Sequence, residues 1–251
     1  MYPILMRTES GFIYTFTAVW GGGIALAIAF MWWQTGPHKR PLPVWADPLL
    51  LGGLAAIFLG RLQFVIQNQA YFAENPTERW AIASGGIGYG GVMLGLGLVV
   101  GMFIWRKPEI GRILLPTVGL LIAWFHLVGW LACLFEGCAF GAETTLAWYA
   151  ADLPDTFGVL AVRYRTQMAG IFFSAAILAV AAVQYRLSGP VSGLWLGLLI
   201  FLVQIMLTTL RGDEMPLIFD RQMRIDTLIG VFIAVVYCLW WLKLLPKNLY
   251  V

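Results

Sequence analysis

Long apolar segments, separated by short stretches of charged and turn-forming residues, dominate the chain. A helix of about 20 apolar residues crosses a bilayer core, and no strand-like alternation competes with these segments over comparable lengths. We therefore expect an all-α integral membrane protein with about seven transmembrane helices. The predicted spans are residues 11–34, 47–69, 84–105, 113–135, 167–185, 191–210 and 227–245.

The charges between these spans favour one orientation in the membrane. All lysines fall in loops on one side of the predicted bundle, at positions 39, 107, 243 and 247. Basic residues gather in cytoplasmic loops, so we expect the N-terminus outside and the C-terminus inside, although Lys and Arg together are nearly balanced. The chain is then a single polytopic membrane domain over residues 1–251, with residues 136–166 as an outer-side loop.

Composition agrees with this class. The chain has 251 residues, of which 60% are hydrophobic and 12% charged, whereas a soluble domain is about 25% charged. The net charge of +3 and the scattered basic residues argue against a nucleic-acid partner. Cys133 and Cys138 lack the CxxC spacing of a zinc or redox pair. Burial as small apolar residues is their default, and a disulfide between them stays open.

Glycine is dense in the third predicted span. Pairs spaced four residues apart are Gly86 and Gly90, Gly91 and Gly95, and Gly97 and Gly101. Such spacing lets helix backbones approach closely, and we favour tight packing within the chain over a dimerisation face. The density of glycine over residues 85–91 also predicts an irregular start to this helix, which protein or a wet cavity has to shield.

Several arginines lie within or next to predicted membrane spans, where charged residues are rare. Arg61 is inside the second span, about eight residues or 12 Å from its outer end, and such a residue usually faces a partner or cavity; the alternative is snorkelling. With Arg163, Arg165 and Arg211 it could form an outer-leaflet phosphate cradle, because guanidinium groups bind phosphate in a bidentate manner. The alternative is that each arginine caps a helix or pairs with a nearby acid.

Residues 126–141 concentrate chemistry in one stretch. They hold His126, Cys133, Glu136, Cys138 and three glycines at the end of a long apolar run. A lone histidine in such a run is more often a hydrogen-bonded structural group than a ligand. The other histidine, His38, lies on the opposite predicted side, so we expect no histidine-based metal site.

These motifs and their order resemble the prolipoprotein diacylglyceryl transferases, over roughly residues 45–245. The similar segments are Gly60-Arg61-Leu62, Tyr89-Gly90-Gly91, residues 126–141, Trp148 with Asp152-Leu153-Pro154-Asp155, Arg163-Tyr164-Arg165-Thr166-Gln167 and Arg211-Gly212-Asp213-Glu214. The resemblance implies transfer of diacylglyceryl from phosphatidylglycerol to the lipobox cysteine of a secreted precursor, at the outer leaflet of the bacterial inner membrane. It implies no metal and no cofactor.

The resemblance also suggests site residues. Those expected to be catalytic are Arg61, Tyr89 and Arg211. Those expected to bind the lipid or the second substrate are Gly90, Gly91, His126, Glu136, Gly137, Gly141, Arg163, Arg165 and Gln167. We expect Arg61 and Arg211 to converge near Tyr89, His126 and Glu136 in an outer-leaflet cavity.

The chain departs from the family pattern at several of these positions. This chain has Trp130 where the family has its signature arginine, and Tyr89 where the family has the third-span histidine. Tyr164 and Arg165 replace the histidine and proline of the Arg-His-Pro motif. Ala169-Gly170 replaces a Tyr-Glu pair, and Gln204 and Thr208 replace a sixth-span arginine and glutamate. Loss of one preorganised donor typically slows a reaction by about 10²–10³.

Two hypotheses follow from these departures. The first is a divergent transferase. The second is a catalytically lapsed, lipid-binding subunit of a larger membrane complex, in which Trp124 and Trp130 add apolar bulk that suits packing against a partner. A transporter is a weaker alternative, because we find neither helices broken at the midplane nor an internal inverted repeat.

Overall fold

The computed structural model describes residues 4–8, 11–34, 42–82, 86–145, 147–155, 157–188, 193–212, 217–218 and 223–224. The chain divides into two compact units. Unit 1 comprises Met1–Lys39 and Gly119–Met215, and unit 2 comprises Arg40–Val118 and Pro216–Val251.

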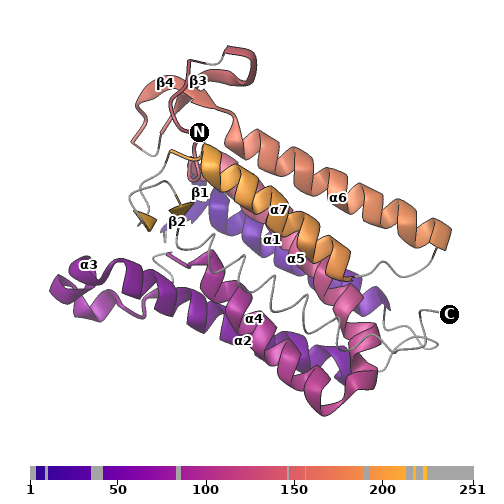
Figure 1. Cartoon of the computed structure of the whole chain (residues 1–251). Coiled ribbons are helices and arrows are strands. Elements are labelled where there is room, and N and C mark those ends of the chain that lie inside the picture. The colour runs from indigo at the N-terminus through magenta and orange to yellow at the C-terminus, as the bar shows by residue number, and fades with distance from the viewer. Residues whose placement is uncertain are drawn as a thin grey trace. The chain divides into compact units, whose positions relative to one another are not determined.

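Unit 1 contains most of the helices. Its elements are β1 (Ile4–Thr8), β2 (Gly11–Tyr14), α1 (Thr15–Gln34), α5 (Pro108–Glu136) from residue 119 onward, a 3₁₀ turn (Ala147–Tyr149), β3 (Ala150–Pro154), β4 (Leu160–Tyr164), α6 (Thr166–Ser188) and α7 (Gly193–Leu210) (Figure 1). β1 pairs with β2, and β3 with β4, as antiparallel hairpins. The α5, α6 and α7 helices share a core of Ala123, Ile177, Ala181, Leu196 and Ile200.

Aromatic side chains attach α1 to α5. The rings of Trp20 and Phe125 stack with centroids 6.0 Å apart, and the Trp124 indole N–H donates to the Gly23 carbonyl at 2.9 Å. Gly23 lies directly under Val128, where a Cβ would meet both methyl groups at 2.8 Å. Close contact of this kind is how helices associate where lipid removes the hydrophobic driving force.

Unit 2 is built on one tight helix pair. Its elements are α2 (Leu42–Gln67), α3 (Gln69–Glu74), a 3₁₀ turn (Pro76–Glu78), α4 (Tyr89–Arg106), the first turns of α5, β5 (Leu217–Ile218) and β6 (Met223–Arg224). A Cβ added at Gly91 would overlap the carbonyl of Leu59, and one at Gly95 would overlap that of Ala55. The prediction of packing within the chain is confirmed at Gly91 and Gly95, where α4 lies against the α2 backbone, but not at Gly97, around which there is open space.

The predominantly helical architecture agrees with the sequence prediction. Among the described residues, four helices are long and apolar enough to cross a bilayer: Thr15–Trp33, Ala46–Gln67, Leu114–Glu136 and Thr166–Gln184. Two shorter apolar helices, Gly90–Arg106 and Trp195–Leu210, match further predicted spans. The seventh predicted span, residues 227–245, lies outside the described residues.

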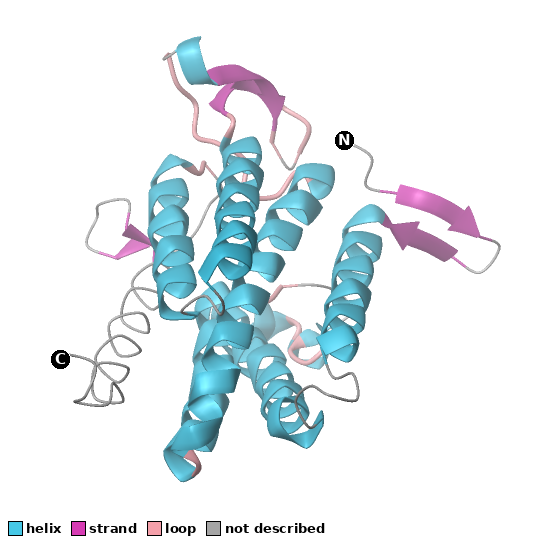
Figure 2. Ribbon diagram, turned by 90° about the vertical axis from the view of Figure 1, so that its right-hand side faces the viewer, coloured by secondary structure: helices cyan, strands magenta, loops and turns pink. Residues whose placement is uncertain are grey.

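Short strands accompany the helices in three described segments, before α1, between α5 and α6, and after α7 (Figure 2). Residues 11–14 form β2, so the first helix begins at Thr15 and not at residue 11. The expected loop 136–166 contains the β3–β4 hairpin. These strands are short, and their side chains alternate over too few residues to compete with the long apolar pattern of the spans. The irregular start of the third span is confirmed, because Gly86 has φ +78° and regular helix begins at Tyr89.

Candidate functional site

Arg61 is the most deeply buried charged side chain named by the sequence analysis, with 1% of its surface exposed. Its guanidinium donates to three backbone carbonyls, those of Glu78 at 2.6 Å, Arg79 at 2.8 Å and Gly86 at 3.1 Å. The rings of Phe64 and Phe72 lie 5.5 and 5.3 Å from its central carbon. The sequence predicted a partner for Arg61, and in these contacts the partner is backbone of the same unit. Arg61 thereby connects Glu78, Arg79 and Gly86 to α2.

The start of α4 is held from α2. The first N–H groups of a helix lack intrahelical partners, and Gly88 caps α4 without a side-chain bond. Gln63 fills this role, because its side-chain oxygen accepts from the Gly91 N–H, while the Gly88 N–H donates to the Gly60 carbonyl at 2.9 Å. These bonds fix the backbone of the Tyr89-Gly90-Gly91 motif, in which both glycines are buried.

His126 stands at the centre of a buried polar cluster in unit 1. Its Nδ1 lies 2.8 Å from Ser174 Oγ, and its Nε2 lies 3.0 Å from Gln204 Oε1. The Trp130 indole N–H donates to the same Nε2 at 3.2 Å. Thr208 extends the cluster by donating to the Gln204 carbonyl at 2.8 Å. We call these residues the His126 cluster; they come from α5, α6 and α7, and none carries a permanent charge.

The donors of this cluster indicate a neutral histidine tautomer. Ser174 donates to the Gly170 carbonyl at 2.6 Å, which leaves its oxygen to accept from Nδ1–H of His126. Nε2 is then the acceptor for the Trp130 indole. The structure places Gln204 Oε1 at 3.0 Å from Nε2, so this tautomer requires the reverse assignment of the two ends of the amide.

Trp130 occupies space that its neighbours leave open. The indole is 5% exposed and packs with Ala139, Ala169 and Leu207. A Cβ on Gly170 would overlap its ring. The idea that Trp130 packs against a partner is wrong, because its bulk is used inside unit 1. The residues that depart from the family pattern at 130, 169, 170, 204 and 208 therefore meet in one place and complement one another.

A turn closed by a disulfide bond follows α5. The structure bonds Cys133 to Cys138, which resolves the pairing that their spacing left open. Gly137 has φ +84° and Ala139 φ +55°, so the chain turns sharply between helix and loop. Gln167 donates to the Cys138 carbonyl at 2.7 Å and, more weakly, to the Cys133 carbonyl at 3.4 Å. The predicted site residues Gly137 and Gln167 are thus joined here.

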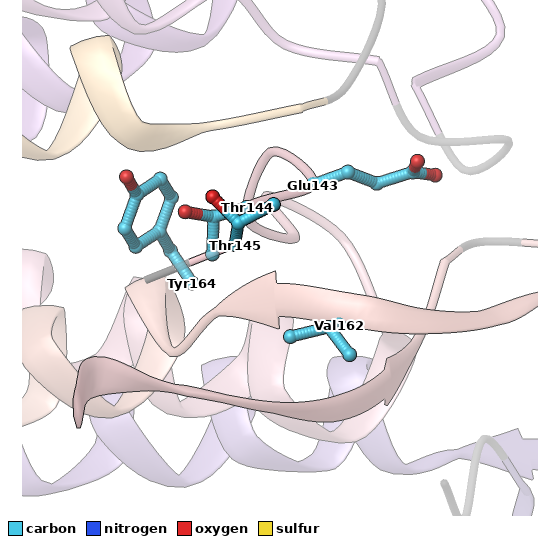
Figure 3. A pocket seen from close by; sticks show the side chains of 5 residues that line it. All are labelled: Glu143, Thr144, Thr145, Val162 and Tyr164. Atoms are coloured by element: carbon cyan, nitrogen blue, oxygen red, sulfur yellow. The ribbon is translucent and has the colours of Figure 1, made fainter. Parts of the chain in front are cut away.

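Arg163 lies on β4, and Arg165 follows this strand directly. Arg163 is buried and lies 3.1 Å from a Glu143 oxygen and 3.5 Å from an Asp155 oxygen, whereas Arg165 is exposed. Burial raises the pKa of Tyr149, whose hydroxyl donates to the Arg165 carbonyl at 3.1 Å. A groove of about 580 Å³ lies beside β4 and is lined by Glu143, Thr144, Thr145, Val162 and Tyr164. Figure 3 shows these side chains.

Backbone pairing links two of the sequence motifs, residues 126–141 and the motif that begins at Arg211. Gly141 forms a bridge with Arg211, and the Gly212 N–H donates to the Phe140 carbonyl at 2.8 Å. Glu136 is the exposed last residue of α5. Arg61, Tyr89, Gly90 and Gly91 belong to unit 2, and the other predicted site residues to unit 1. Their convergence on a common cavity stays a prediction.

Sequence reasoning missed Ser174. Ser174 follows Gln167 and Gly170 at helical spacing, so all three share one face of α6; that spacing could have pointed to it. No metal was expected, and within the described part of the chain no group of three or more His, Cys, Asp or Glu side chains could hold one.

Comparison with known proteins places the chain in a family. The family model for prolipoprotein diacylglyceryl transferase matches residues 3–243. A phosphatidylglycerol–prolipoprotein diacylglyceryl transferase of Pseudoalteromonas translucida is 28% identical over 191 residues, which are 69% of each chain. One with the same name from Corynebacterium glutamicum is 34% identical over 106 residues, 41% of this chain and 33% of that protein. The matched region spans nearly the whole chain, which therefore belongs to the prolipoprotein diacylglyceryl transferase family.

Proposed function

We propose that the protein is a slow phosphatidylglycerol-dependent diacylglyceryl transferase, working at the outer leaflet of a bacterial inner membrane. The observation that supports this most is the packing of its second- and third-span motifs, in which Arg61 and Gln63 hold the backbone at Glu78, Arg79, Gly86 and Gly91. The family match and the names of the two relatives supply the reaction. The second substrate is a prolipoprotein with a lipobox cysteine.

The reaction replaces one bond by another. The cysteine sulfur loses its proton to a base and forms a C–S bond with the terminal glycerol carbon of the diacylglyceryl group. The C–O bond to phosphate breaks, and glycerol phosphate leaves with the electron pair. A fixed cation near that phosphate speeds the step. In this chain Trp130 stands where the family has its signature arginine, so we expect transfer at least about 10² slower than in the relatives.

A peptide mass-shift assay tests this proposal. Purified protein, phosphatidylglycerol vesicles and a lipobox peptide are mixed, with the Pseudoalteromonas enzyme as positive control and phosphatidylethanolamine vesicles as negative control. We expect a diacylglyceryl adduct that requires phosphatidylglycerol and the peptide thiol. The Arg211→Ala variant is expected to abolish it. Absence of any adduct while the control enzyme works would overturn the proposal.

The His126 cluster favours a second candidate function, a lipid-binding subunit of a membrane complex without catalysis. Its members satisfy one another by hydrogen bonds, and Trp130 fills the space above Gly170. Because the polar groups of the cluster already have hydrogen-bond partners, no bound substrate is needed to satisfy them. This candidate predicts no adduct in the assay above and stable co-purification with other membrane subunits. Recovery of only the free monomer in mild detergent would count against it.

A further inference from the structure

The β3–β4 hairpin exposes a set of large apolar side chains outside the predicted spans. The set, called here the hairpin surface, has exposed fractions of 84% at Trp148, 91% at Phe157, 59% at Val159, 68% at Leu160 and 46% at Val162. Trp148 lies in the 3₁₀ turn before β3, and the other four lie on β4 or the turn before it. Exposed apolar side chains of this size indicate a surface that binds a protein or a membrane. The hairpin precedes α6 directly in the chain (Figure 1).

An ordered turn presents the tip of this surface. Asp155 accepts at one carboxylate oxygen from the N–H groups of Phe157 at 2.8 Å and Val159 at 2.9 Å. The Asp155 N–H donates in turn to the Val159 carbonyl at 3.0 Å. Gly158, with φ +84°, supplies the left-handed residue that the turn requires. Phe157 is therefore held outward by a fixed backbone.

The hairpin separates its charges from its apolar side chains. Successive residues of a strand point to opposite faces, so Leu160 and Val162 face away from Arg163. Arg163 is 7% exposed and braces Glu143 and Asp155. One face of β4 thus holds the ion pairs of Arg163. The other exposes Leu160 and Val162, with Val162 beside the groove that Glu143, Thr144, Thr145 and Tyr164 line.

The position of the hairpin in the chain suggests what covers this surface. β4 ends at Tyr164, and the candidate span Thr166–Gln184 begins two residues later. A strand of five residues reaches about 17 Å, so the hairpin stays close to the bilayer surface. Met168 and Phe172, four residues apart on the first turns of α6, are also exposed and continue the apolar contact toward lipid.

We propose that the hairpin surface binds the lipid–water interface of the same membrane, with Phe157 in the acyl region and Trp148 at headgroup level. Aromatic side chains favour this boundary, and the exposed Arg165 at the base of the hairpin can reach lipid phosphates. A phospholipid surface fits better than a protein partner because the candidate span of α6, whose first turns expose Met168 and Phe172, begins two residues after β4. The inference is independent of whether transfer occurs.

Spin labelling tests the proposal in the intact chain. A nitroxide is attached to the thiol introduced by the substitution Phe157→Cys in a Cys238→Ser background, with the Cys133–Cys138 disulfide kept. A second variant, Glu143→Cys, labels an exposed polar position of the same outer region as matched control. Both proteins are reconstituted in phosphatidylglycerol-containing vesicles, and collisions with oxygen and with a water-soluble nickel chelate are measured.

The expected result is a clear difference between the two labels. At position 157 we expect oxygen collisions to exceed nickel collisions several-fold, as in lipid, and the reverse at position 143. Nickel-dominated collisions at 157 would overturn the proposal in favour of a water-exposed tip. Low collisions with both reagents at 157 would also overturn it, because protein would then cover the surface. Unchanged thermal unfolding of both labelled proteins in detergent verifies the fold, since exposed positions tolerate substitution.

Discussion

Arg61 and the His126 cluster represent two ways of burying polar groups among apolar helices. In unit 2, one permanent cation is held by three backbone carbonyls of a single loop. In unit 1, neutral side chains from three helices hold one another. Both arrangements satisfy the requirement that buried polar groups be hydrogen-bonded, but the first uses fixed backbone and the second uses side chains.

This difference explains which positions can change. Backbone carbonyls stay in place whatever the sequence is, so a residue that satisfies three of them has few substitutes. Side chains that satisfy each other can be replaced as a set. Trp130 and Gly170 are such a set, because the missing side chain at 170 makes room for the indole at 130. By the resemblance described above, Gly60-Arg61-Leu62 in unit 2 is similar to the family's arginine motif, and the expected departures at Trp130, Gln204 and Thr208 lie in unit 1.

Removing the Arg61 guanidinium should have the largest effect. Arg61→Met leaves the carbonyls of Glu78, Arg79 and Gly86 without these donors, and hydrogen bonds to a charged group contribute about 1.5–3 kcal/mol each. We expect the free energy of unfolding to fall by about 4 kcal/mol or more, measured by thermal unfolding in detergent. Arg61→Lys is the control; it keeps the charge without the fork and should lose less. Equal loss in both variants would show that the fork geometry is not what matters.

Crowding Trp130 should have an intermediate effect. Gly170→Ala places a methyl group in the indole and should destabilise the protein by about 1–3 kcal/mol. Gly197→Ala in α7 has open space around it and should stay within about 0.5 kcal/mol. A double-mutant cycle with Trp130→Ala measures the coupling, and the alanine at 170 should be tolerated once the indole is gone. Additive effects in that cycle would contradict the packing between residues 130 and 170.

Opening the Cys133–Cys138 disulfide should have the smallest effect. The bond closes a short loop, for which the chain-entropy account gives about 2 kcal/mol. Because Gln167 and Thr166 hold carbonyls of the same turn, we expect reduction to lower the unfolding temperature without loss of the fold. Thermal unfolding with and without reductant measures this, and a Cys133→Ser/Cys138→Ser variant should be insensitive to reductant. A wild-type protein that reductant does not affect would argue against the disulfide.

Much of unit 2 could be predicted from the sequence. The length of each apolar segment located the spans, and four-residue glycine spacing located the contact of α4 with α2. The burial of Arg61 followed from its place in a span, but its partners did not, because backbone carbonyls leave no mark in the sequence. The contact between Trp130 and Gly170 also joins residues 40 positions apart, and only the fold brings these together. The β3–β4 hairpin was missed because its strands are five residues long.

The most direct test compares the diacylglyceryl transfer rate of the wild-type protein with that of a variant whose charges in unit 1 are restored. The variant Trp130→Arg/Gln204→Arg/Thr208→Glu returns the residue types that the family pattern has at these positions and supplies a carboxylate beside the buried cations. With folding verified by thermal unfolding, we predict slow transfer by the wild type and a rate at least about 10² higher for the variant. A wild-type rate equal to that of the Pseudoalteromonas enzyme, or no gain in the folded variant, would contradict the claim that neutral packing in the His126 cluster limits the reaction.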